Sequence, residues 1–160
     1  MNILNKHYTT HLTMLIKCVL ATEGSVLELG AGPASTPVLH WLCQEKRRKL
    51  HTYESNNYFY KYARCFQSGN HKIFRVNWDE FTIDGYWSVV LIDEPSKYRA
   101  KTIDLVKDKA DYIVIHDTDH AGEKRYADVL TKFKYRHDWK ACTPWTTVVS
   151  NFKDTSWLTP

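Results

Sequence analysis

The sequence predicts an α/β protein built as a three-layer sandwich, with helices on both faces of a mostly parallel seven-stranded sheet. Short apolar runs alternate with helical patterns along residues 8–132, which is typical of parallel strands joined by crossover helices. A glycine turn, Gly30-Ala31-Gly32, follows the first apolar run. Two strand-like segments end the pattern with only a short connection between them, so they must pair antiparallel.

The first helix is predicted over residues 8–21, with Thr9 or Thr10 as its cap. Apolar side chains recur there at helical spacing and predict one buried face, made of Leu12, Leu15, Ile16, Val19 and Leu20. A strand over residues 25–29 precedes the glycine turn. Ser35 or Thr36 can cap the next helix, which has Pro37 at its first position, where a missing N–H costs nothing.

The rest of the chain repeats this alternation. The predicted strands are 50–54, 72–77, 87–92, 112–115, 133–139 and 146–152, and the predicted helices are 56–66, 97–109 and 122–132. The run 87–92 is almost continuously apolar, as in a central strand of a parallel sheet. The basic run 46–49 follows the second helix and has two interpretations: cations that complement a helix dipole, or a phosphate-binding patch.

Composition limits the class of protein. Of the 160 residues, 43% are apolar and 25% are charged, as in a globular protein. We expect one domain over residues 1–160, with an N-terminal helix in 1–22, a core over 23–152 and a tail over 153–160. No apolar run approaches the ~18 residues of a membrane helix, and the four cysteines lack paired spacing. A cytoplasmic protein with reduced thiols and no membrane contact is expected.

Five alternating units followed by a hairpin resemble the class I S-adenosylmethionine (SAM)-dependent methyltransferases, whose Rossmann-like sheet ends in such a hairpin. The resemblance covers roughly residues 22–152. The first motif of that family, an acidic residue followed by G-x-G, resembles residues 28–32 here. Its second acid, at the end of the second strand, resembles Glu54.

The resemblance implies SAM as the cofactor. Glu28 would face the methionyl ammonium, Glu54 would accept hydrogen bonds from the ribose hydroxyls, and the polar positions after the third strand would contact adenine. The implied cofactor-binding residues are Glu28, Gly30, Ala31, Gly32, Glu54, Ser55, Asn77, Trp78, Asp79 and Asp93. A dinucleotide-binding fold shares the glycine turn, but Glu28 would repel its pyrophosphate.

The chain departs from the family at two places. Ala34 or Ser35 stands where many members have a third glycine, and Asp93-Glu94-Pro95 replaces the Asn-Pro-Pro-Tyr or Asp-Pro-Pro-Tyr that amino-methylating members carry. The second departure gives no support to amino-methylating chemistry. Because 160 residues leave no inserted substrate domain, either the acceptor is small or a partner subunit completes the site.

The most unusual local sequence, residues 116–120, follows the fifth predicted strand, where ligands bind in open α/β sheets. His116 or His120 can serve as a general base, with Asp117 as a further catalytic residue. Alternatively, Asp93 and Asp117 hold Mg²⁺, which would lower the pKa of an acceptor hydroxyl. A helix cap with solvated neighbours is the third interpretation.

We therefore expect a SAM-dependent methyltransferase that acts on oxygen in a small-molecule acceptor. Two other functions stay open: a SAM-binding protein without transfer activity that serves a partner, and a nucleic-acid methyltransferase. The mildly basic net charge of +4 permits an anionic partner. Because the chain is short, a second copy completing the site is open as well.

Overall fold

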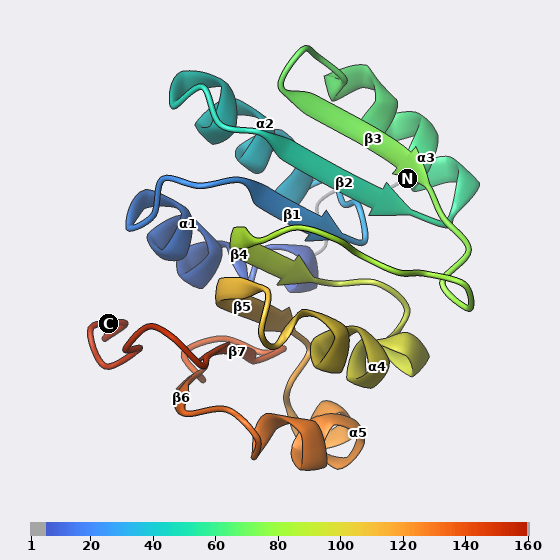
Figure 1. The fold of residues 1–160 in the computed structure, drawn as a ribbon. Helices are drawn as coiled ribbons and strands as arrows, with labels where there is room; N and C mark the ends of the chain where they lie inside the picture. The colour runs from blue at the N-terminus through green and yellow to red at the C-terminus, as the bar shows by residue number, and fades with distance from the viewer. Residues whose placement is uncertain (1–5, 160) are drawn as a thin grey trace.

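Seven strands form one sheet in the computed structural model, which describes residues 6–159 apart from the side chains of Lys6 and of residues 120–124. They are β1 (Val26–Leu29), β2 (Leu50–Glu54), β3 (His71–Arg75), β4 (Trp87–Ile92), β5 (Ala110–His116), β6 (Tyr135–Trp139) and β7 (Thr146–Ser150). Their order is β3-β2-β1-β4-β5-β7-β6 (Figure 1). Neighbouring strands from β3 to β5 are parallel, and β7 is antiparallel to both β5 and β6. The predicted α/β architecture is confirmed.

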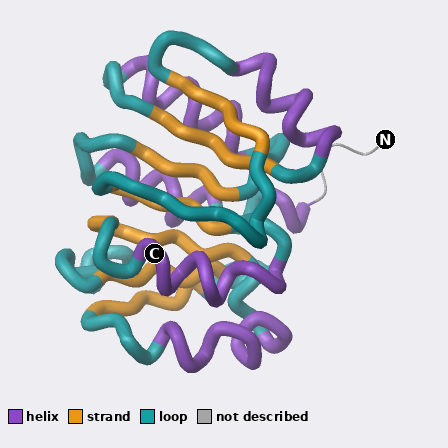
Figure 2. Tube along the Cα trace, turned by 45° about the vertical axis from the view of Figure 1, so that its right-hand side comes forward, coloured by secondary structure: helices purple, strands orange, loops and turns teal. Residues whose placement is uncertain are grey.

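Helices cover both faces of this sheet (Figure 2). The described helical elements are η1 (Lys6–Tyr8), α1 (Leu12–Leu20), α2 (Ser35–Glu45), α3 (Asn57–Ala63), η2 (Arg64–Phe66), α4 (Ser96–Val106) and α5 (His120–Leu130). One apolar cluster joins α1 and α2 to one face, and another joins α4, α5 and the loop 76–86 to the opposite face. Among the described helices, none is long and apolar enough to cross a membrane.

The N-terminal helix differs from its prediction in start and in buried face. It begins at Leu12, and its N-cap residue, His11, makes no side-chain cap; the Thr10 hydroxyl contacts His116 instead. The buried side chains are Met14, Leu15, Cys18 and Val19, whereas Leu20 is 53% exposed. The predicted face is therefore rotated, because α1 packs on β4 and β5 with its methionine and cysteine rather than with Leu20.

The basic run after α2 is not a uniform surface patch. Arg48 is buried and donates hydrogen bonds to the carbonyls of Val19, Thr22 and Gly24, at 2.6, 3.0 and 2.6 Å. A guanidinium therefore satisfies carbonyl groups at and beyond the end of α1, not those of the helix that precedes it. Neither interpretation from the sequence applies to Arg48.

The four cysteines lie in different environments. All four are free, with Cys18 and Cys43 buried, Cys142 half-buried and Cys65 exposed. No disulfide therefore constrains the described fold, and its stability rests on the two large apolar clusters and a small third one of Ala31, Ala63 and Ile73.

Candidate active site

A cavity of about 360 Å³ opens at the carboxyl ends of β1, β2, β4 and β5. The strand order reverses between β1 and β4, which is where open α/β sheets bind ligands. Its wall includes residues from these strand ends and from the N-terminal segment: Ala31, Gly32, Glu54, Asp93, Glu94, His116, Asp117, His7, Tyr8 and His11. This volume lies at the lower end of the range that ligand-binding pockets have.

The two glycines of the first turn, Gly30 and Gly32, differ in whether the fold requires a glycine at that position. Gly30 has φ +92°, and a Cβ there would lie 2.4 Å from the carbonyl carbon and oxygen of Asp93. The fold itself therefore requires Gly30. A Cβ on Gly32 would meet only the Ser35 Oγ, at 3.6 Å, and Gly32 lines the cavity. Packing does not require a glycine there, and the space beside Gly32 is open to the cavity.

Glu54 is tied to the glycine turn by backbone donors. Its Oε2 accepts a hydrogen bond from the Ala31 N–H at 2.8 Å, and its Oε1 accepts one from the Asn56 N–H at 2.5 Å. Burial raises the pKa of this carboxyl, and the N–H donors oppose that shift. Each oxygen keeps a lone pair, so Glu54 can accept two further hydrogen bonds from a ligand in the cavity that it lines.

Glu28 lies under the turn rather than in the cavity wall. Its carboxylate is fully buried and accepts hydrogen bonds from the hydroxyls of Ser35, Thr36 and Thr52, at 2.6, 3.0 and 2.7 Å. The Thr36 Oγ1 also accepts the Gly32 N–H at 3.0 Å. Burial raises the pKa of Glu28 to about 7 against these donors. The carboxylate thus anchors the turn through Thr36.

These hydroxyls explain why the predicted cap of α2 is wrong. Ser35 and Thr36 lie inside the first turn, and Ala34 is the N-cap residue without a side-chain bond. Both hydroxyls donate to the buried carboxyl of Glu28 instead of capping the helix.

The predicted adenine-contacting residues gather beyond the cavity wall. The Trp78 Nε1 donates to the Ser55 Oγ at 2.9 Å, and the Asn77 Oδ1 accepts the Asp79 N–H at 3.2 Å. Of the neighbouring side chains, Phe59 lines the cavity instead. A contact between adenine and residues 77–79 remains a prediction.

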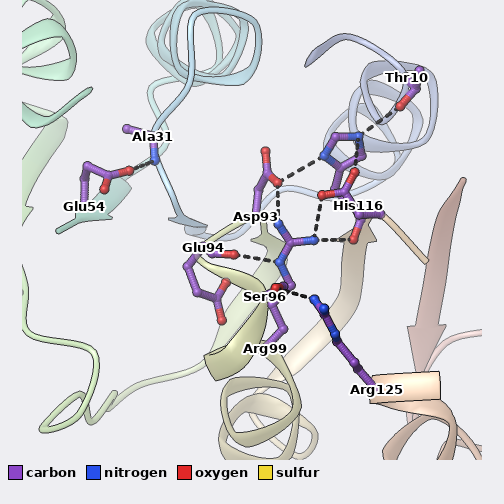
Figure 3. Close-up of polar contacts among 10 residues, drawn as sticks. Thr10, Ala31, Glu54, Asp93, Glu94, Ser96, Arg99, His116 and Arg125 are labelled. Atoms are coloured by element: carbon purple, nitrogen blue, oxygen red, sulfur yellow. Dashed lines mark hydrogen bonds and ion pairs between the residues drawn. The ribbon is translucent and has the colours of Figure 1, made fainter. Parts of the chain in front are cut away.

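On the β4–β5 side, the Arg99 guanidinium joins two strand ends (Figure 3). It is 5% exposed, and its Nη2 and Nη1 lie 3.0 Å from the Asp93 Oδ1 and the Asp117 Oδ2. It also donates to the carbonyls of Glu94 and His116, both at 2.7 Å. The predicted Mg²⁺ pair, Asp93 and Asp117, does not fit that ion, because an ion between these two carboxylates would have to displace the guanidinium that already lies there.

His116 has partners on both ring nitrogens. Its Nδ1 lies 3.0 Å from the Asp93 Oδ1, and its Nε2 lies 2.9 Å from the Thr10 Oγ1. Burial favours the neutral ring, but the hydrogen bond and charge of Asp93 outweigh it and raise the pKa of His116. A general-base role requires Thr10 to release Nε2 and stays a prediction. The side chain of His120 lies outside the described residues.

The sequence analysis assigned no role in the site to Arg99, Thr10 or His11. Arg99 carries no local signal, because its partners lie 5 to 18 positions away. His11 precedes the buried Leu15 and Val19 at intervals of four residues, so a histidine that extends a buried helical face was the available signal.

The sequence matches no protein-family model, and no curated protein is similar to it. The structure, however, is similar to solved methyltransferases. The SAH-bound Podospora anserina methyltransferase PaMTH1 has a TM-score of 0.69 at 11% identity, over 90% of this chain and 78% of that one. Human methyltransferase 10 domain containing protein has a TM-score of 0.66 at 11% identity, over 89% of this chain and 83% of that one. The N-terminal domain of human METTL16 in complex with SAH has a TM-score of 0.64 at 10% identity, over 90% and 71%. This chain has the fold of the class I SAM-dependent methyltransferases.

Proposed function

We propose that this chain is a SAM-dependent methyltransferase. One observation carries the proposal: Glu54 and the glycine turn line the same cavity, and the Ala31 N–H holds them together at 2.8 Å. A carboxylate at the end of β2 beside a close-approach glycine is the arrangement that binds a nucleoside in this kind of sheet. Solved relatives in fold are described as bound to SAH, the demethylated product of SAM.

The residues present fit this cofactor. When bound, SAM supplies a methyl group on a positively charged sulfur. Glu54 would accept hydrogen bonds from the ribose hydroxyls, and Gly32 would allow the ligand to approach the backbone. His7, Tyr8 and His11 would wall the cavity from water. The cavity thus includes residues of the N-terminal segment as well as residues of the expected core over 23–152. The division of the chain into an N-terminal helix, a core and a tail stays a prediction.

We place the methyl acceptor at the end of the cavity formed by β4 and β5. His116 and Asp117 line it there, opposite Glu54 across the sheet order β2-β1-β4-β5. The volume of about 360 Å³ suits a cofactor and a small acceptor better than a large one. A small molecule with an oxygen nucleophile is the acceptor class that we propose.

Calorimetric titration with SAM and with SAH tests cofactor binding. The Glu54→Gln variant should bind both at least tenfold more weakly, because one charged acceptor is lost. Glu45→Gln, which changes an exposed glutamate at the end of α2, is the matched control and should bind as the unaltered protein does. Equal affinities for all three proteins would refute the assignment of Glu54.

A turnover assay separates the remaining alternatives. SAH formation would be followed with small phenols and alcohols, and separately with RNA oligonucleotides. Turnover of the small acceptors supports the proposal. Turnover of RNA alone, weakening steeply with salt, would replace it with nucleic-acid methylation. Cofactor binding without any turnover would replace it with a binding module.

A further inference from the structure

His11 is a buried histidine in the wall of the cavity. It is 1% exposed, and neither Nδ1 nor Nε2 has a hydrogen-bond partner among the described residues. Its ring meets the ring of His116 edge-on, with centroids 4.6 Å apart. Most buried polar side-chain atoms have a partner, so an exception calls for an explanation. A ligand in the cavity that His11 lines would supply one.

Asp93 and His116 complete a set of donors around His11. One ligand atom from each of the three residues lies within 4.8 Å of the other two. The His116 Nδ1 and the Asp93 Oδ1 are 3.0 Å apart. Ligand atoms held about 2.1 Å from one tetrahedral ion lie about 3.4 Å apart. The 3.0 Å between Asp93 and His116 is close to that spacing, and the His11 nitrogen, which lies within 4.8 Å of both partners, would have to approach them by at most about 1.4 Å.

The surroundings resemble the outer shell of a metal site. The His116 Nε2 is held by the Thr10 hydroxyl at 2.9 Å, so Nδ1, which contacts the Asp93 Oδ1 at 3.0 Å, is the nitrogen that would bind an ion in place of its proton. The Asp93 Oδ1 accepts a hydrogen bond from Arg99 at 3.0 Å. Ligating histidines and carboxylates are commonly fixed by such partners. With neutral imidazoles, Asp93 and Asp117 against Arg99 leave one negative charge in excess, which favours a cation.

We propose that His11, Asp93 and His116 bind a divalent transition-metal ion such as Zn²⁺ or Co²⁺. Two imidazoles and one carboxylate favour these ions over Mg²⁺, which prefers oxygen ligands. Three protein ligands leave a position open for an exchangeable group. The proposal that a metal ion binds rests on these three residues alone. The proposal that the bound ion activates an acceptor oxygen at this end of the cavity rests on the proposed function.

The test is titration of metal-free protein with Co²⁺, followed by its visible spectrum, and with Zn²⁺ and Mg²⁺ by calorimetry. We expect one Co²⁺ or Zn²⁺ per chain, a spectrum without a sulfur charge-transfer band, and no heat from Mg²⁺. His11→Gln should weaken binding about 100-fold, since one ligand is lost. His51→Gln, at a half-buried position of β2 that does not line the cavity, should not weaken it.

Three outcomes would overturn the metal site. They are no stoichiometric binding to the unaltered protein, equal binding to the His11→Gln variant, and a sulfur-ligated spectrum, which would place the ion on a cysteine. His11→Gln removes no hydrogen bond of the described structure, so it should fold, and thermal unfolding would verify this. Titration of the same samples with SAM shows whether the cofactor binds. A negative result for the metal site can therefore be distinguished from a negative result for the proposed function.

Discussion

The β1–β2 side and the β4–β5 side of the cavity are built in different ways. On the β1–β2 side, backbone N–H groups of Ala31 and Asn56 hold Glu54, and hydroxyls from the first turn of α2 hold Glu28. On the β4–β5 side, one buried guanidinium, that of Arg99, joins the ends of both strands. The β1–β2 side is therefore held by several hydrogen-bond donors, whereas the β4–β5 side is held mainly by the Arg99 side chain.

This difference affects how each side responds to change. Backbone donors persist in most variants, so the β1–β2 side should lose function only where a side chain or a Cβ intrudes. Arg99 is 5% exposed and satisfies two carboxylates and two carbonyls. Removing it breaks a buried ion pair with Asp93, which then keeps only His116 among its described charged partners, and takes a donor from two carbonyls. Breaking a buried ion pair is among the costliest changes in a protein. Substitutions on the β4–β5 side should therefore lower the stability of the protein before they affect its activity.

The largest effect is expected from Arg99→Met. Breaking a buried ion pair by removing one partner costs about 3–5 kcal/mol, so the free energy of unfolding in urea should fall by about 4 kcal/mol. Arg125→Met is the matched control, because Arg125 is exposed and bonds only the Ser96 Oγ, at 2.6 Å, among the described contacts. Its effect should stay within about 0.5 kcal/mol. Similar losses in both variants would contradict the contrast between the two sides.

The glycine turn offers a comparison within the β1–β2 side. Gly30→Ala should cost about 3 kcal/mol or more, from positive-φ strain and from the clash with Asp93. Gly32→Ala should leave stability within about 0.5 kcal/mol, since its Cβ meets only Ser35 at 3.6 Å. Its SAM affinity should nevertheless fall at least tenfold. Urea unfolding and calorimetry on both variants measure this, and unaltered SAM binding in Gly32→Ala would mean that the cofactor does not approach the turn.

Glu28 gives the β1–β2 side a pH dependence. Burial raises its pKa from 4.5 to about 7, so the folded protein keeps a proton that the unfolded chain has lost. The stability that Glu28 contributes is full below pH ~4.5 and falls as pH rises to ~7, by about 3 kcal/mol at most. Unfolding of the unaltered protein and of Glu28→Gln across this range measures the difference in stability, which should decline with pH and level off above ~7.

Comparing the two proteins is necessary because other groups titrate in the opposite direction. Burial lowers the pKa of His71 from 6.5 to about 4, so its contribution is lost as pH falls through that range. The His71 Nε2 lies 2.8 Å from the Thr52 Oγ1, which in turn donates to Glu28. Subtracting the Glu28→Gln curve removes the shared histidine contribution. A constant difference from pH 4.5 to 7 would show that Glu28 is ionised throughout.

The fold could be predicted because its signals are local. β2 and β4 have the predicted bounds, residues 50–54 and 87–92, since apolar runs between glycine, proline and polar breaks define strands within a short window. The buried face of α1 could not be predicted as accurately as the strand bounds. Whether Leu20 or Met14 is buried depends on where the helix crosses the sheet, and that is set by partners distant in the sequence.

The site divides in the same way. The glycine turn and Glu54 belong to motifs at fixed spacing, and the structure brings them onto one cavity. The environment of Glu28 was not foreseen, because the direction of its side chain depends on packing beneath α2. Arg99 and Thr10 were missed because their partners are set by tertiary contacts, with Thr10 and His116 separated by 106 positions.

The smallest effect is expected at Thr10, where the N-terminal segment meets the β4–β5 side. Thr10→Val keeps the shape of the side chain but removes the hydroxyl that contacts the His116 Nε2 at 2.9 Å. A single hydrogen bond contributes about 1 kcal/mol, so urea unfolding should register a loss of that size. Thr131→Val, at an exposed hydroxyl that bonds the Asp128 carbonyl, should change stability by less than about 0.5 kcal/mol. A loss of 3 kcal/mol or more at Thr10 would mean that His116, and not Arg99 alone, holds the β4–β5 side together.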